Sequence, residues 1–91
     1  MMKEIRYNLE KREKSLHERG IDLEIVAHLI NEWEIITIAK VPSRTDQKMF
    51  TLTLLYRDYV CCVPYVENEE EIFLKTAYLS RKMNKLLNNN H

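Results

Sequence analysis

Apolar positions in the first quarter of the chain follow a helical period and are bounded by recognisable helix-end residues. Asn8 is a preferred N-cap, Glu10 places a negative charge in the first turn, and the segment from Asn8 to Arg19 is therefore predicted to be a helix. Within it, Leu9 and Leu16 are the only interior apolar positions. This pattern predicts one thin apolar stripe that faces the core.

A second, more apolar helix is predicted directly after the first. Gly20, the only glycine of the chain, is expected to end the first helix in the left-handed conformation that glycine adopts without strain. Asp22 can cap the next helix, over residues 23–30. Its apolar residues recur at the spacing i, i+3, i+4, i+7, namely Leu23, Val26, Ala27 and Ile30. We expect this helix to be the more buried of the two.

From residue 33 the pattern changes to that of strands. Residues 33–40 are rich in β-branched and aromatic side chains, and residues 48–57 alternate between apolar and polar positions. Asp58 marks a tight turn before a third, nearly all-apolar strand over residues 59–66. Pro64 cannot donate a backbone hydrogen bond, so its presence implies an edge, a bulge or the end of that strand.

The last third of the chain predicts one more strand and a helix. An acidic turn at residues 67–70 leads to a strand over residues 71–78, and Ser80 can cap a final helix. The inward-packing residues of that helix are expected to be Met83, Leu86 and Leu87. The order ααββββα over residues 1–91 predicts a single α+β domain of two layers, with helices on one face of an antiparallel four-stranded sheet.

Composition agrees with one folded domain and excludes some function classes. The 91 residues make 11.0 kDa, which leaves no room for a second core. Fourteen basic residues balance fourteen acidic ones, which excludes a uniformly basic nucleic-acid-coating surface but allows a local basic patch. No apolar run approaches the roughly 20 residues needed to span a bilayer. The first residues are charged and show no secretion signal, so we expect a cytoplasmic protein.

The cysteines and histidines do not point to a metal or a cofactor. Cys61 and Cys62 are neighbours in one apolar run, and neighbours on a strand point to opposite faces. Their spacing fits no zinc motif, so we expect two small buried hydrophobic residues in a reducing compartment. The three histidines are scattered and pair with no cysteine or glutamate at ligand spacing.

Two segments of the chain carry a family resemblance. Residues 7–11 stand where the family has a Trp-Asp-x-x-Lys element, and Lys11 matches it directly. Ser15 stands in place of an asparagine, and Arg19 followed by Gly20 stands in place of His-Gly. Residues 75–78 take the place of the Ile-Ser-Ala-Arg that ends the family's fourth strand. In these residues and in the order of its elements, the chain resembles the BrnT family of toxins.

The resemblance implies a fold, an activity and partners. It implies a RelE-like α+β fold, the toxin role in a type II toxin–antitoxin system, and a ribonuclease activity that cleaves mRNA. It further implies a cognate DNA-binding antitoxin of the ribbon-helix-helix type, encoded beside the toxin, which blocks it and represses the operon. RelE-like nucleases build diffuse active sites from arginine, lysine and tyrosine.

Cleavage of RNA through the 2′-hydroxyl needs a base, positive charge on the phosphorane and an acid for the leaving oxygen. Residues 72–91 contain four basic residues and no acidic one, which predicts a local electropositive patch. Arginine binds phosphate oxygens in a bidentate way, and Arg81 begins a helix, where an anion is favoured. The candidate catalytic residues are Arg81, Arg57, Arg44 and Tyr78, and the candidate RNA-binding residues are Lys11, Lys75 and Lys82.

Two other functions fit the same pattern. The neutral net charge, and Tyr78 where the family has arginine, favour a catalytically inactive RelE-like module that binds a partner protein. A plain nucleic-acid-binding domain is a third reading, although the chain lacks interleaved aromatic and basic residues and a recognisable DNA-reading helix. Cleavage of a purified transcript separates the first reading from the second.

Overall fold

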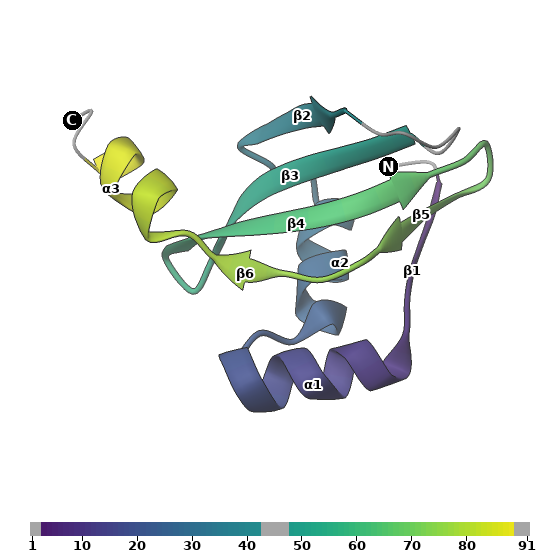
Figure 1. Ribbon diagram of the computed structural model, residues 1–91, viewed down its shortest axis with the longest axis horizontal. Helices are drawn as coiled ribbons and strands as arrows, with labels where there is room; N and C mark the ends of the chain where they lie inside the picture. The colour runs from purple at the N-terminus through teal and green to yellow at the C-terminus, as the bar shows by residue number, and fades with distance from the viewer. Residues whose placement is uncertain (1–2, 43–47, 89–91) are drawn as a thin grey trace.

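The computed structural model describes residues 3–42 and 48–88, and within these ranges the chain forms an α+β domain (Figure 1). Three helices accompany a mixed, open six-stranded sheet, so the expected order ααββββα and the antiparallel four-stranded sheet are both wrong. The elements in chain order are β1 (Glu4–Tyr7), α1 (Leu9–Arg19), α2 (Leu23–Asn31), β2 (Thr37–Val41), β3 (Lys48–Tyr56), β4 (Tyr59–Glu67), β5 (Glu71–Leu74), β6 (Tyr78–Leu79) and α3 (Arg81–Asn88).

Strand β1 makes the sheet mixed. The strand order is β1-β5-β4-β3-β2, with β1 parallel to β5 and every other pair antiparallel, and β6 also pairs with β4. Ile5 and Tyr7 alternate with the exposed Glu4 and Arg6, and the two apolar side chains pack against the core. Four residues with two charges give little local strand signal. The strand exists because β5, far away in the sequence, supplies its hydrogen-bonding partner.

The strand predicted over residues 71–78 is broken into β5 and β6, and Pro64 of β4 explains the break. The backbone N–H of Lys75 donates to the Pro64 carbonyl oxygen at 2.9 Å, so the Pro64 nitrogen also faces this neighbouring strand. That nitrogen carries no hydrogen, and the ladder cannot continue there. Pairing resumes only where Cys62 meets Tyr78. Residues 75–77 form the connection between the two short strands.

The core lies between α2 and the sheet. Helices α1 and α2 lie on the same side of the sheet, and α2 is the one that runs up to it (Figure 1). The buried cluster combines the apolar face of α2 with alternate residues of β3, β4 and β5. Its α2 residues are Leu23, Val26, Ala27 and Ile30, as the helical spacing predicted. The greater burial of the second helix is thereby confirmed.

Helix α1 begins and ends as predicted but buries a different position. The Asn8 side chain accepts hydrogen bonds at the helix start, and Gly20 ends the helix with a φ of 69°. Leu9 and Leu16, however, are 69% and 46% exposed, so the expected apolar stripe is wrong. Helix α1 lies beyond the end of α2 that is farther from the sheet, rather than flat on the sheet (Figure 1), and most of its residues are exposed. The buried residue of α1 is Ser15.

Around β2 and the β3–β4 turn, local geometry decides the boundaries. The strand predicted from Trp33 begins only at Thr37, because Trp33 has a φ of 59° and its N–H still donates to Ile30 at the end of α2. The predicted tight turn is confirmed. Arg57 and Asp58 both have positive φ, and such a two-residue turn matches the twist of an antiparallel hairpin.

Helix α3 is attached to the start of β4. The Ser80 N–H donates to the Val60 carbonyl oxygen, and the Val60 N–H donates to the Asn84 side chain. The Ser80 hydroxyl accepts from the Met83 N–H, which confirms the predicted cap. Leu86 is 51% exposed, so its expected inward packing is wrong. The helix projects past the end of β6 (Figure 1).

The two cysteines are free and buried, as predicted for small hydrophobic residues. Burial, together with the neighbouring Cys62 thiol, raises the pKa of Cys61 to about 12. The thiol therefore stays protonated and unreactive in the folded protein. None of the helices in the described ranges is long and apolar enough to cross a bilayer.

An ion-pair cluster locks α1 to α2. Arg12 donates two hydrogen bonds to the Asp22 carboxylate, at 2.8 and 3.1 Å, and also contacts Glu24 at 3.0 Å. Asp22 in turn caps α2, and its backbone N–H donates to the Tyr56 hydroxyl at 3.0 Å. The Arg12 hydrogen bonds hold the pKa of Asp22 below its ordinary value. The cluster thus fixes the angle between the two helices.

This cluster makes stability depend on pH. Because the pKa of Asp22 is lower in the folded state, its stabilising effect is complete above the unfolded value of about 3.9 and is lost as the pH falls through the folded value. We expect Arg12→Gln to lower the urea midpoint at pH 7, and the difference from the wild type to shrink below pH 4. Arg6→Gln is the matched control, since the Arg6 pairs are long and exposed and its effect should be small. An equal loss at both pH values would contradict the assignment.

Candidate functional site

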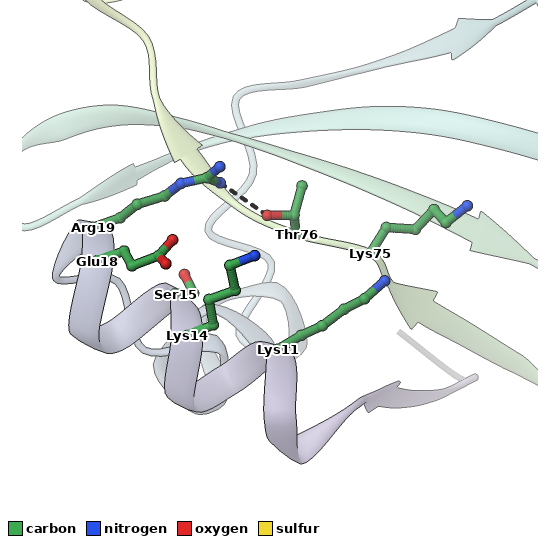
Figure 2. A pocket seen from close by; sticks show the side chains of 7 residues that line it. All are labelled: Lys11, Lys14, Ser15, Glu18, Arg19, Lys75 and Thr76. Carbon is green, nitrogen blue, oxygen red and sulfur yellow. Dashed lines mark hydrogen bonds between the residues drawn. The ribbon is translucent and has the colours of Figure 1, made fainter.

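A cationic pocket lies between α1 and the connection from β5 to β6 (Figure 2). Its volume is about 310 Å³. Two segments far apart in the sequence form it, one on each side. Its lining residues are Lys11, Lys14, Ser15, Glu18, Arg19, Lys75 and Thr76. We refer to these seven residues as the α1 pocket.

The helical period explains why one helix supplies five of these side chains. Positions 11, 14, 15 and 18 are spaced by three, four and seven, and position 19 lies four after 15, so they share one face of α1. Four cationic side chains face one carboxylate, Glu18. Among the described residues, none of the four cations is in an ion pair, whereas Lys3, Arg6 and Arg12 all are. The α1 pocket therefore carries uncompensated positive charge.

Arg19 connects the two sides of the α1 pocket. Its Nη1 donates to the Thr76 hydroxyl and to the Ala77 carbonyl oxygen, both at 2.9 Å. Strand β1 runs beside β5 only as far as Leu74, so β1 provides no N–H group for the Ala77 carbonyl oxygen. Gly20 ends α1 directly after Arg19 and keeps it at the helix terminus. The Arg19 guanidinium thus joins α1 to the β5–β6 connection and forms one wall of the pocket.

Ser15 lies at the base of the α1 pocket. The residue is 5% exposed, and its hydroxyl is buried without a hydrogen-bond partner among the described residues. In Figure 2 the hydroxyl rises from α1 between the side chains of Lys14 and Glu18, on the side of α1 that faces the β5–β6 connection. Serine in a helix usually satisfies its hydroxyl by bonding the carbonyl one turn earlier, and Ser15 does not. A buried hydroxyl without a partner costs about 1–3 kcal/mol.

The structure brings together some of the predicted site residues and separates the others. Lys11 and Lys75, which are distant in the sequence, both line the α1 pocket. Arg81 and Lys82 are exposed at the start of α3 and do not line it. The Arg57 guanidinium lies 5.6 Å from the Tyr56 ring centroid in the β3–β4 turn.

The remaining predicted catalytic residues are Tyr78 and Arg44. Tyr78 is 40% exposed on β6, where it pairs with Cys62. Partial burial and the cysteine thiols raise the pKa of Tyr78, so its phenol holds its proton more firmly than usual. Arg44 lies outside the described residues.

Sequence reasoning missed Lys14, Ser15, Glu18, Arg19 and Thr76 as site residues. The common helix face of the first four could have been inferred from their spacing along α1. The contribution of Thr76 was not readable, because it depends on the break between β5 and β6. Within residues 3–42 and 48–88, no three His, Cys, Asp or Glu side chains are grouped so that they could hold a metal ion.

Searches against protein-family models, curated proteins and solved structures found no match to this chain.

Proposed function

We propose that this protein is the toxin of a type II toxin–antitoxin system, with a RelE-like fold, and that it cleaves RNA in the cytoplasm. The observation that carries the proposal is the α1 pocket, where Lys11 and Lys75 meet with two further cations and without ion-pair partners among the described residues. Unpaired cations from two segments in one concave site suit a polyanionic backbone. Among the positions compared with the BrnT family, this pocket is lined by Lys11, which matches, and by Ser15 and Arg19, which stand where the family has asparagine and histidine.

The proposed reaction is transfer of a phosphodiester to the adjacent 2′-hydroxyl. The 2′-oxygen attacks phosphorus, a base takes its proton, the bond to the 5′-oxygen breaks, and an acid protonates that leaving oxygen. Glu18 is the one carboxylate that lines the α1 pocket and is our candidate for the base. The lysines and Arg19 stabilise the extra negative charge of the phosphorane.

The cationic start of α3 forms a second surface in this proposal. Arg81 and Lys82 are exposed there, outside the α1 pocket, and Arg81 would bind phosphate oxygens elsewhere along the RNA strand. Arg57 adds charge from the β3–β4 turn, Arg44 remains a candidate from the sequence alone, and Tyr78 orients the RNA by stacking on a base or serves as the acid. The raised pKa of Tyr78 favours the stacking role at neutral pH.

A hollow lined mainly by apolar side chains supports the proposal that this protein binds a protein partner. Trp33, Ile36 and Leu55 are 66%, 43% and 48% exposed and line a pocket of about 160 Å³ together with Leu29, Glu34 and Ile35. Exposed apolar side chains gathered around a hollow are typical of a protein-binding surface. We propose that the cognate antitoxin, of the ribbon-helix-helix type, docks here.

The test is expression of the chain alone in bacteria. We expect growth arrest with loss of intact mRNA, and rescue by co-expression of the neighbouring reading frame. Purified protein should cleave a transcript, and Arg81→Ala should reduce cleavage while the circular dichroism spectrum is unchanged. Normal growth with soluble expression and intact RNA at high protein concentration would overturn the ribonuclease proposal.

A catalytically inactive interaction module is the second candidate. The observation that favours it is the firmly held proton of Tyr78 where the BrnT family has arginine, because the site then has one cation fewer and a poorer acid. In that case the apolar hollow around Trp33 would still bind its partner, while RNA would remain intact.

A further inference from the structure

We propose that the base of the α1 pocket is a seat for one phosphate group, with the Ser15 hydroxyl as a dedicated hydrogen-bond donor. Lys14 and Arg19 supply the charge next to this seat, and Lys11 and Lys75 supply further positive charge along the pocket (Figure 2). The inference rests on the proposed function only for its view that RNA is the source of the phosphate. It gives Ser15 a binding role that neither the resemblance nor the charge pattern assigns.

The first argument is the unsatisfied hydroxyl. Only 5% of the Ser15 surface is exposed, and its Oγ has no hydrogen-bond partner among the described residues. An alanine at this position would avoid the cost of the buried hydroxyl and would favour the helix. A hydroxyl can donate to a phosphate oxygen, and that bond, made to a charged acceptor, is stronger than one between neutral groups. A hydrogen bond to a bound phosphate would therefore offset the free-energy cost of the unpaired hydroxyl in the ligand-free protein.

The second argument is the arrangement of charge along the α1 pocket. Lys14 and Arg19 lie at the same end of the pocket as the hydroxyl, and Thr76 and Ala77 hold Arg19 in place, whereas Lys11 and Lys75 extend toward the other end (Figure 2). Figure 2 shows the hydroxyl flanked by Lys14 and Glu18. Both flanking residues are exposed and unbranched, so they can turn aside when an anion enters. A fixed guanidinium and mobile ammonium groups together suit a compact, multiply charged anion.

The experiment uses the full chain and inorganic phosphate as the probe. Phosphate should raise the Tm of the wild type in a saturable way, and chloride at equal ionic strength should not. Without phosphate, Ser15→Ala should raise the Tm by about 4 °C or more, because the unsatisfied hydroxyl is removed. The same variant should bind phosphate roughly 10-fold to 100-fold more weakly, as expected for one lost hydrogen bond to a charged group.

Two further variants keep the test decisive. Lys14→Ala changes an exposed side chain, so it should weaken phosphate binding with the Tm of the unliganded protein unchanged. Lys40→Ala, on the exposed edge strand β2, should change neither quantity. Unchanged phosphate affinity in Ser15→Ala, or the absence of saturable binding in the wild type, would overturn the inference.

The source of the phosphate is settled by two nucleotide probes. A 2′-deoxy dinucleoside monophosphate offers an internal phosphodiester, and uridine 3′-monophosphate offers a terminal phosphate. Competition by the first places an internal linkage in the seat, and competition by the second alone places a chain end or reaction product there. Ser15-dependent phosphate binding without RNA cleavage would refute the ribonuclease proposal and leave the seat intact. Cleavage that is insensitive to Ser15→Ala would refute the phosphate seat and leave the ribonuclease proposal intact.

Discussion

Replacement of Leu54 by alanine is expected to lower the free energy of unfolding by about 2–5 kcal/mol. Leu54 is 0% exposed near the end of β3, where it belongs to the cluster between the sheet and α2. The truncation removes buried methyl groups and leaves a cavity that close-packed neighbours only partly fill. Domains of this size are typically stable by about 5–15 kcal/mol, so the variant should be close to unfolding at growth temperature. Urea denaturation followed by circular dichroism measures the loss.

Leu55→Ala is the matched control for this prediction. The residue is the next one along the same strand and its side chain points to the opposite face, where it is 48% exposed. We expect its effect on the free energy of unfolding to stay within about 0.5 kcal/mol. If the two substitutions cost the same, the sheet face that covers α2 has been assigned wrongly.

Removal of two cations from the α1 pocket should have the largest effect on activity. In the double variant Lys11→Ala and Lys75→Ala, transcript cleavage is expected to fall by about 100-fold or more, since the phosphorane loses charge stabilisation on both walls. The salt dependence of RNA affinity should also become shallower. Each lost contact with single-stranded RNA reduces the slope of log K against log salt by about 0.7, so two should reduce it by about 1.4.

A control variant that removes one cation outside the α1 pocket separates the effect of the pocket from general electrostatics. Lys40→Ala lies on the edge strand β2, outside the α1 pocket, and should leave cleavage unchanged. Neither Lys11 nor Lys75 uses its side chain in an ion pair among the described residues, so folding should be retained. Full cleavage by a folded double variant would move the proposed site to the cationic start of α3.

The elements that could be predicted from the sequence are those with a strong local signal. Asn8, Gly20 and Asp22 mark helix ends through their own side chain or backbone, and the spacing of apolar residues identified the buried face of α2. Strand β1 could not be predicted in this way, because it is held by β5 across most of the chain. The orientation of α1 was also inaccessible, so the exposed Leu16 was expected in the core.

For the candidate site, the sequence predicted individual basic residues but not which of them share a pocket. Lys11 and Lys75 were both predicted to bind RNA, and the structure places them on opposite walls of one pocket. The expected cluster around Arg81, in contrast, is not joined to these walls. Whether two residues line the same pocket depends on their distance in space. No local sequence pattern encodes the distance between α1 and a segment about 60 residues later.

The sequence by itself determined the class of fold, the capped ends of α1 and α2, the hairpin turn after β3 and the burial of the two cysteines. Each of these follows from residues that act on their immediate neighbours. The tertiary structure alone decided the parallel pairing of β1, the break opposite Pro64 and the pocket that Arg19 closes through Thr76 and Ala77. These features arise because a backbone group without a partner in its own strand must find one elsewhere in the fold.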